Sequence, residues 1–213
     1  MTSSSPHQRP EFTGTTLRRV DLSEQPLDQF RNWLQDAVKA AVLEPYAVTL
    51  ATVQPDGLPN ARTVLLKQVD ATGFVFTTAE SPKTREFRAN PHVALVFYWP
   101  ALERQVRVSG SVAEMTRAQS ARMYEVRPHD QRVALLAFPQ SQPVPSRKAL
   151  DEKYRELRKE YAHEEVPIPA HWGAWHVAPN VVEFWQGGVN RLHDRFQYRR
   201  GDENIWTVTR LAP

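Results

Sequence analysis

The order of hydrophobic and polar positions predicts one helix followed by a series of short strands. Residues 26–42 place apolar side chains such as Leu27, Phe30 and Val38 at helical spacing, and Ser23 is the expected N-cap. Apolar runs bounded by turn residues then predict strands over residues 47–53, 62–67, 74–78, 92–98 and 104–115. The segment 62–67, Arg-Thr-Val-Leu-Leu-Lys, has the pattern of a buried strand with a charge at each end.

The middle of the chain changes to helical patterns. Thr116 and Gln119 have the spacing of a capping box for a helix that ends near residue 126. Two more helices are expected over residues 128–137 and 146–163, and closing strands over residues 174–177, 181–185, 195–200 and 205–210. This order predicts an antiparallel β-barrel with helices packed around it, in the mainly β (α+β) class.

Length and composition favour one domain that works without disulfides. The 213 residues are 41% hydrophobic, which is enough for one sizeable core, expected over residues 21–213 after a flexible segment at 1–20. Cysteine is absent, which excludes disulfides and thiolate nucleophiles. No apolar run is long enough to cross a bilayer, and the first residues do not resemble a secretory signal. We therefore expect a cytoplasmic protein that does not enter membranes.

The charge pattern favours a small anionic ligand over a nucleic acid. The net charge is +3, but the 27 basic residues are interleaved with 24 acidic ones and form no basic tail. The seven histidines show no pair at metal-ligand spacing, so no metal site is predicted.

The stretch EFWQGGVNRLHDRFQYRR, residues 183–200, concentrates aromatic, glycine, basic and imidazole groups. Two strands with a turn at Gly187-Gly188 would explain its outline, since glycine reaches positive φ without penalty. In that interpretation Trp185 is a core residue, and Arg191 and His193 are solvated. The density of donors around one turn instead indicates a ligand site.

Two other segments place polar donors in apolar surroundings. Ser81-Pro82-Lys83 has the pattern of a helix start, where free N–H groups and a lysine suit a phosphate. Gln105 interrupts the apolar run at 102–106. Each feature alone is more simply explained by a solvated strand end or helix start. Together they indicate a pocket for an anionic, aromatic, phosphorylated ligand.

These segments resemble the pyridoxamine 5′-phosphate oxidase family. The matching elements occur in the family's order and cover the chain from about Arg9: RTVLLK at 62–67, Thr77-Thr78 with Lys83, LERQV at 102–106, RP at 127–128, QS at 140–141, EFWQGG-x-x-RLHDR at 183–195 and RLAP at 210–213. The resemblance implies a split β-barrel homodimer with FMN at the subunit interface. The residues that it implies for the flavin are Arg62, Thr63, Val64, Leu65, Leu66, Lys67, Thr77, Thr78, Lys83, Gln105, Gln140, Ser141, Trp185 and Arg195.

The resemblance also implies a reaction. Pyridoxamine or pyridoxine 5′-phosphate would be oxidised to pyridoxal 5′-phosphate, with O2 as acceptor and H2O2 as product. Arg191 and His193 would act on the substrate ring as catalytic residues. The residues implied for substrate binding are Arg9, Phe12, Lys67, Met123, Arg127, Gln131, Arg191, Leu192 and His193.

Four positions depart from the family's usual residues, and all four belong to ligand sites. Phe12 stands for a lid tyrosine, Pro82 for a basic residue, Met123 for a tyrosine and Gln131 for a serine, and Tyr124 could replace the tyrosine missing at 123. An alternative is therefore a paralogue that oxidises another small aromatic metabolite, as phenazine-pathway relatives do. A second alternative is a split-barrel protein that binds FMN or pyridoxal phosphate without turnover.

Overall fold

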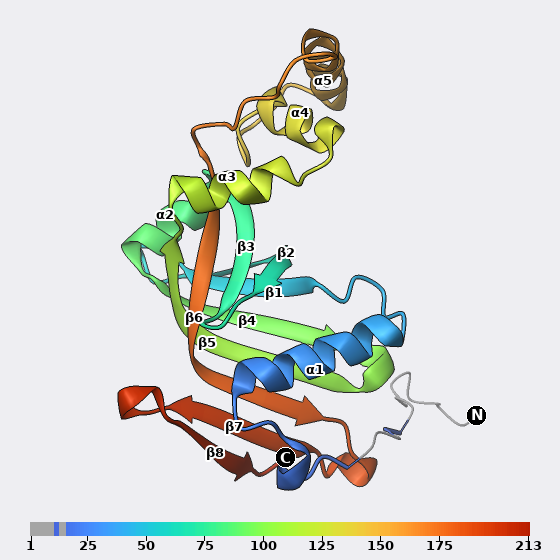
Figure 1. Ribbon diagram of the computed structural model, residues 1–213, viewed down its shortest axis with the longest axis vertical. Coiled ribbons are helices and arrows are strands. Elements are labelled where there is room, and N and C mark those ends of the chain that lie inside the picture. The colour runs from blue at the N-terminus through green and yellow to red at the C-terminus, as the bar shows by residue number, and fades with distance from the viewer. Residues whose placement is uncertain (1–10, 13–15) are drawn as a thin grey trace, which may run out of the picture. The chain divides into compact units, whose positions relative to one another are not determined.

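The computed structural model describes residues 11–12 and 16–213 (Figure 1). Its five α-helices, among these residues, are α1 Pro26–Lys39, α2 Pro82–Ala89, α3 Arg117–Glu125, α4 His129–Ala137 and α5 Arg147–Glu160. Its eight strands there are β1 Ala47–Val53, β2 Pro59–Val69, β3 Phe74–Ala79, β4 His92–Trp99, β5 Arg104–Glu114, β6 Trp172–Gln186, β7 Asp194–Arg200 and β8 Trp206–Leu211. None of the described helices is long and apolar enough to cross a membrane.

The strands form one sheet that closes on itself. Their order is β3-β2-β1-β4-β5-β6-β7-β8, and an additional pairing of β3 with β6 closes the first six strands into an antiparallel barrel. Strands β7 and β8 extend the sheet beyond the barrel, with Phe184 opposite Phe196 and Tyr198 opposite Val208. The predicted antiparallel barrel with packed helices is confirmed.

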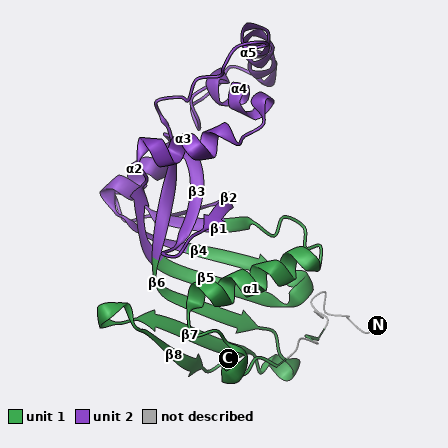
Figure 2. Cartoon of the chain, in the orientation of Figure 1, with its two compact units in different colours: residues 1–48, 95–109, 179–213 green, residues 49–94, 110–178 purple. Residues whose placement is uncertain are grey.

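The chain divides into two compact units (Figure 2). Unit 1 comprises residues 1–48, 95–109 and 179–213, as far as they are described, and unit 2 comprises 49–94 and 110–178. Each unit has an aromatic core of its own. In unit 1, Phe30 of α1 lies 4.7 Å from Phe97, between ring centroids. In unit 2, Phe87 of α2 lies 4.9 Å from Trp175 of β6.

Helix α1 begins at the predicted residue but differs at its cap and its end. Gln25 occupies the N-cap, so the prediction of Ser23 was wrong, and the Ser23 N–H donates to the Gln29 side chain instead. The helix ends early because Ala41 takes a left-handed conformation, with φ 51°, that closes a Schellman-type turn. Val38, in the last turn of the helix, lies on its exposed side.

Strand β6 is longer than the sequence predicted. The expected break between residues 177 and 181 is wrong, because one strand runs through Pro179. Residues 172–177 pair with β3 and residues 181–186 pair with β7. Residues 178–180 pair with neither β3 nor β7. Pro179 has no N–H, but its position therefore removes no hydrogen bond to these two strands.

Strand β2 is covered on one face only, so the prediction of a buried strand over 62–67 was wrong. Leu66 is its single buried residue there, and Thr63, Leu65 and Lys67 are exposed. Successive side chains of a strand point to opposite faces, so Thr63, Leu65 and Lys67 lie on the face opposite to that of Leu66. The exposed face therefore carries one of the two charges that bracket the segment, and it is available to a ligand.

Candidate functional site

The residues assigned from the sequence fall into two sets, one in each unit. Unit 2 holds the cations Arg62, Lys67, Lys83 and Arg127. Unit 1 holds His193 and the rings packed against it, those of Phe12 and Trp185. Arg9 lies outside the described residues. We describe each set by itself.

Lys83 is a buried cation held only by neutral groups. Its side chain lies at the start of α2, and the residue is 8% exposed. Nζ donates to Ser81 Oγ at 2.9 Å and to Gln140 Oε1 at 3.1 Å. The described residues offer it no ion pair, and burial, followed by the charge of Arg62, lowers the Lys83 pKa to about 8 from 10.5. A bound phosphate would supply the missing negative charge.

Gln140, in the loop after α4, completes a polar cradle around the Lys83 ammonium. Its Oε1 also accepts hydrogen bonds from Thr78 Oγ1 at 2.8 Å and from the Ala79 N–H at 3.3 Å. Ser141 follows in a left-handed conformation, with φ 64°. Two predicted cofactor residues, Thr78 and Lys83, thus donate to the same side-chain oxygen of a third, Gln140.

Arg62 is held by a buried carboxylate that the sequence did not reveal. Its Nη2 lies 3.0 Å from Oε2 of Glu86, which is 4% exposed, and Nη1 donates to Thr52 Oγ1 at 2.6 Å. Asn60 also donates to Glu86, at 3.0 Å. The hydrogen bonds of Thr52, Asn60 and Arg62 hold the pKa of the Glu86 carboxyl below its usual range despite burial.

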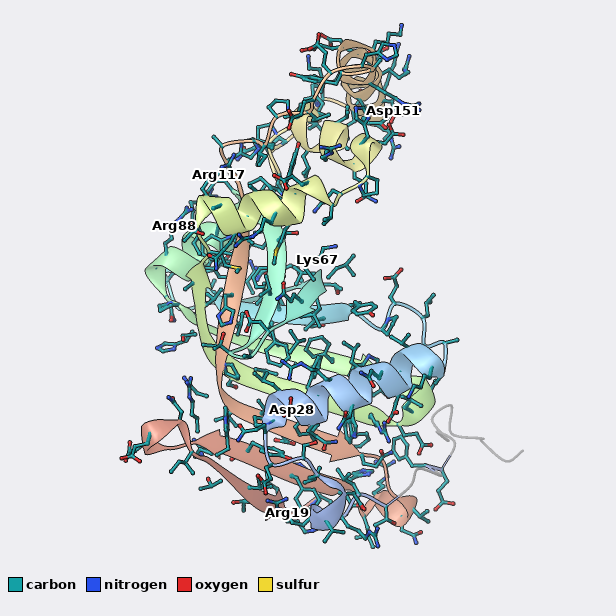
Figure 3. The ribbon with its side chains drawn as sticks, in the orientation of Figure 1. Arg19, Asp28, Lys67, Arg88, Arg117 and Asp151 are labelled. Carbon is teal, nitrogen blue, oxygen red and sulfur yellow. The ribbon has the colours of Figure 1, made fainter. Side chains whose placement is uncertain are left out.

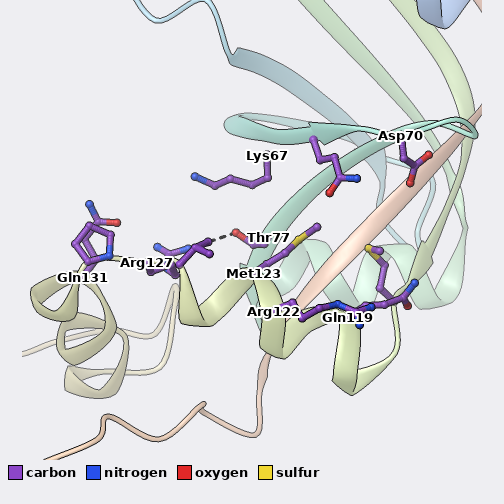
Figure 4. Close-up of a pocket in the computed structure, with 12 residues that line it drawn as sticks. Lys67, Asp70, Thr77, Gln119, Arg122, Met123, Arg127 and Gln131 are labelled. Carbon is purple, nitrogen blue, oxygen red and sulfur yellow. Dashed lines mark hydrogen bonds between the residues drawn. The ribbon is translucent and has the colours of Figure 1, made fainter.

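A cavity of about 600 Å³ in unit 2 gathers the predicted substrate-binding residues of that unit (Figure 4). Lys67 enters it from the exposed face of β2 (Figures 3 and 4), and Arg127 enters it from the end of α3. Met123 and Gln131 line the same space. The prediction that these four residues share one pocket is consistent with this geometry.

The cavity contains positive charge that has little compensation within the unit. Arg127 makes a long hydrogen bond of 3.4 Å from Nη1 to Thr77 Oγ1 and lies over the Trp172 ring, while its Nε is buried without a partner. Burial lowers the pKa of Arg127, and partial burial together with the Arg127 charge lowers the pKa of Lys67. No described residue forms an ion pair with either cation. Two such cations in one pocket favour a phosphate.

Tyr124 does not take the place of the tyrosine missing at position 123. Its ring is buried against Trp172 at 5.3 Å between centroids, and its hydroxyl donates to the Pro167 carbonyl at 2.9 Å. Only Met123 of the two lines the cavity. Adjacent helical residues point about 100° apart, which explains why the substitution suggested from sequence fails.

In unit 1, two aromatic rings pack against His193. Its ring centroid lies 4.8 Å from that of Trp185 and 5.4 Å from that of Phe12, and Phe12 lies 5.6 Å from Trp185. The Gly188 N–H donates to His193 Nδ1 at 3.1 Å. A neutral imidazole therefore carries its proton on Nε2, which can donate to a ligand.

The two glycines serve close packing, and the predicted positive φ was wrong. Gly57 has the only positive φ among the described glycines. A Cβ on Gly187 would lie 2.8 Å from Phe12 Cδ1, and one on Gly188 would lie 2.2 Å from the Leu192 carbonyl oxygen. The left-handed residues of this connection are Asn190 and Arg191, with φ 55° and 63°. The chain bends there, after the glycines, and leaves Arg191 and Leu192 exposed.

Gly188→Ala should destabilise the protein because its Cβ would meet backbone. Overpacking of this kind costs about 1–3 kcal/mol of the free energy of unfolding. Urea unfolding measures the loss. Gly201→Ala is the control, since a Cβ there would lie an ordinary 3.5 Å from the Ile205 carbonyl oxygen. Equal stability of the two variants would contradict the close approach.

Arg195 is held by Glu183, a second carboxylate whose partner the sequence did not reveal. Nε of Arg195 donates to Glu183 Oε1 at 2.9 Å, and Nη1 donates to the Ala212 carbonyl at 2.8 Å. Asp194 of the same motif has a structural role, because it accepts from the Leu17 N–H and pairs with Arg210. Gln105 is half-buried in β5. No local sequence pattern indicates these partners, because residues that bond to each other here lie at least 12 positions apart.

The chain is similar to known proteins over nearly its whole length. The family description "Pyridoxamine 5′-phosphate oxidase" matches residues 34–161, and "Pyridoxine 5′-phosphate oxidase C-terminal dimerisation region" matches residues 172–213. A relative from Salinibacter ruber, named pyridoxine/pyridoxamine 5′-phosphate oxidase, is 46% identical over 96% of this chain and 97% of its own length. One of the same name from Rippkaea orientalis is 43% identical, with the same coverage.

Solved structures share the fold. PhzG from Burkholderia lata, in complex with tetrahydrophenazine-1-carboxylic acid, has a TM-score of 0.88 at 28% identity and covers 94% of this chain and 99% of its own. An FMN-binding protein related to pyridoxamine 5′-phosphate oxidase, from Nostoc punctiforme, has a TM-score of 0.73 at 18% identity over 90% of this chain and 100% of its own. With both family regions matched and full-length relatives above 40% identity, the chain belongs to the pyridoxamine 5′-phosphate oxidase family, and its relatives' names indicate an oxidoreductase.

Proposed function

We propose that the protein oxidises pyridoxine 5′-phosphate and pyridoxamine 5′-phosphate to pyridoxal 5′-phosphate, with FMN as cofactor and O2 as acceptor. The observation that carries this proposal is the pair of uncompensated cations, Lys67 and Arg127, in one cavity of about 600 Å³. They suit a phosphate on a small aromatic substrate. The names of relatives at 43–46% identity support the same substrate class.

The cradle at Lys83 fits the phosphate of FMN. A buried ammonium that has only neutral partners, next to a helix N-terminus, suits a phosphate. In the proposed site Arg62 adds a second cation, while residues 63–67, Thr77, Thr78 and Ser141 line the flavin. The family resemblance also assigns Gln105, Trp185 and Arg195 to the flavin, with some of these contacts made by the partner subunit. We further propose a homodimer with the cofactor at the interface, in keeping with the matched dimerisation region.

The chain's own residues position the substrate for oxidation. Lys67 and Arg127 bind the substrate phosphate, Arg191 orients the ring and favours its ionised 3-oxygen, and His193 donates a hydrogen bond from Nε2. Phe12 and Trp185 pack against the imidazole and fix its orientation. When bound, FMN supplies the acceptor for a hydride from the substrate's C4′ carbon, and O2 then takes up the electrons and yields H2O2. Water hydrolyses the imine that an amine substrate forms.

The affinity for FMN should fall as the pH rises above about 8. Lys83 has a folded-state pKa near 8, so its ammonium loses the proton needed for phosphate binding from that pH upward. The stability of the free protein should change in the opposite direction between about 8 and 10.5, because the unfolded chain then binds more protons than the folded one. Fluorescence titration with FMN measures the affinity, and Lys83→Met should remove this step. A wild-type profile that stays flat to pH 9.5 would contradict the assignment.

Anaerobic mixing tests the function directly. The protein is loaded with FMN, pyridoxine 5′-phosphate is added without oxygen, and flavin absorbance is followed. Bleaching that reverses on admission of air is the expected result. Bound flavin that stays oxidised would overturn the proposed substrate.

Met123 supports a second candidate function. This side chain gives the cavity an apolar wall where the family usually has a hydroxyl, and PhzG, whose structure holds a phenazine compound, has the same fold at 28% identity. Oxidation of another anionic aromatic compound would use the same donors. A reduced tricyclic carboxylic acid that bleaches the flavin faster than pyridoxine 5′-phosphate would favour this function.

A further inference from the structure

We propose that Glu183 is a positioning residue that fixes the guanidinium of Arg195 toward the cofactor. The proposal rests on the proposed function, because it takes Arg195 to face FMN. Every contact that carries it lies within unit 1. It gives a role to a buried carboxylate that the reaction itself does not use.

Glu183 is a charged group in a place where charge is costly. Its side chain is 6% exposed on β6, and burial of an unpaired carboxylate is strongly unfavourable. Two guanidiniums compensate it, one at each oxygen. Arg195 Nε lies 2.9 Å from Oε1, and Arg107 Nη1 lies 3.3 Å from Oε2.

The register of the hairpin explains the direction of the contact with Arg195. Residue 195 lies opposite Trp185, while Glu183 lies opposite Gln197. Arg195 therefore reaches diagonally across the strand pair to Glu183, a distance that long side chains span. The contact turns its guanidinium along β6, on the face that Trp185 shares with Glu183.

Two of the three guanidinium nitrogens are thereby used. Glu183 accepts from Nε and the Ala212 carbonyl accepts from Nη1, so the planar fork has one orientation. No residue in the described part of the chain bonds to Nη2, and the Arg195 side chain is 25% exposed, so a ligand can reach this nitrogen. The arrangement leaves this nitrogen as the donor for a ligand.

The two arginines on Glu183 differ in a way that provides a matched control. The Arg107 side chain is 55% exposed and its bond to Glu183 is longer. Loss of Arg107 removes one cation from the carboxylate and leaves the fork of Arg195 in place. A role of Glu183 in positioning therefore predicts unequal effects of Glu183→Gln and Arg107→Gln.

The experiment is a double-mutant cycle on FMN binding, read by quenching of flavin fluorescence. Glu183→Gln should weaken FMN binding about tenfold in the wild-type background and less than about twofold in an Arg195→Leu background, because the loss acts through Arg195. Arg107→Gln should leave the FMN affinity unchanged. An equal loss in both backgrounds, or none in the wild type, would overturn the proposal.

Arg195→Lys keeps the result decisive if Glu183→Gln does not fold. Lysine retains the charge but cannot bond both Glu183 and Ala212 and still present a third fixed donor, so FMN affinity should fall about tenfold. Wild-type affinity of this variant would show that charge alone matters, and would overturn the proposal. Wild-type protein that binds no FMN would refute the proposed function itself, whereas normal binding with unaffected variants refutes only the role of Glu183.

Discussion

Lys83→Met should weaken FMN binding about a hundredfold, because charge-assisted hydrogen bonds contribute about 1.5–3 kcal/mol. The stability of the protein without cofactor should stay the same. Removal of Lys83 relieves the protein of a buried cation that has only neutral partners. The Gln140 oxygen keeps its hydrogen bonds from Thr78 and Ala79. Fluorescence titration measures the affinity, and thermal unfolding without FMN measures the stability.

Arg85→Met is the matched control for this experiment. It removes one positive charge from the same helix, but its side chain is 58% exposed and its nearest carboxylate oxygen, on Glu80, lies at 4.0 Å. FMN affinity should change little in this variant. If both variants lose affinity equally, net charge and not the cradle governs binding.

Arg127→Met should lower kcat/KM for pyridoxine 5′-phosphate about a hundredfold, mostly through KM, since it removes a charged donor from the substrate phosphate. Folding should be little affected. The guanidinium makes one long hydrogen bond to Thr77, and its Nε has no partner. Methionine keeps much of the packing against Trp172, so activity and stability should separate.

Steady-state kinetics with Arg158→Met as control decides this prediction. Arg158 belongs to the same unit, is 61% exposed and pairs with Asp130. Its loss should leave KM unchanged while the net charge falls equally. A KM that stays at the wild-type value in Arg127→Met would remove this residue from the substrate site.

Local patterns predicted the elements well where a short stretch decides the structure. The capping pair Thr116 and Gln119 starts α3 as expected, and β1 covers the predicted residues. Predictions were wrong where distant pairing decides. Strand β6 continues through Pro179 because two different strands pair with its two halves.

The candidate site shows the same division. Basic residues at strand and helix ends were visible as donors, and the family resemblance gave them roles. The carboxylates that hold them were not assigned, because Glu86 and Glu183 meet Arg62 and Arg195 only through the fold. Tyr124 illustrates the reverse case, since its side chain points into a core that the sequence alone does not place.

The connection between β6 and β7 also determines where directed evolution of the substrate range should begin. Positions 187 and 188 exclude side chains for lack of space, and positions 190 and 191 restrict the backbone through their left-handed conformations. Leu192 has neither restriction: its φ is −79° and it is 71% exposed. Saturation mutagenesis at this position should give the largest share of folded variants in which the surroundings of His193 have changed.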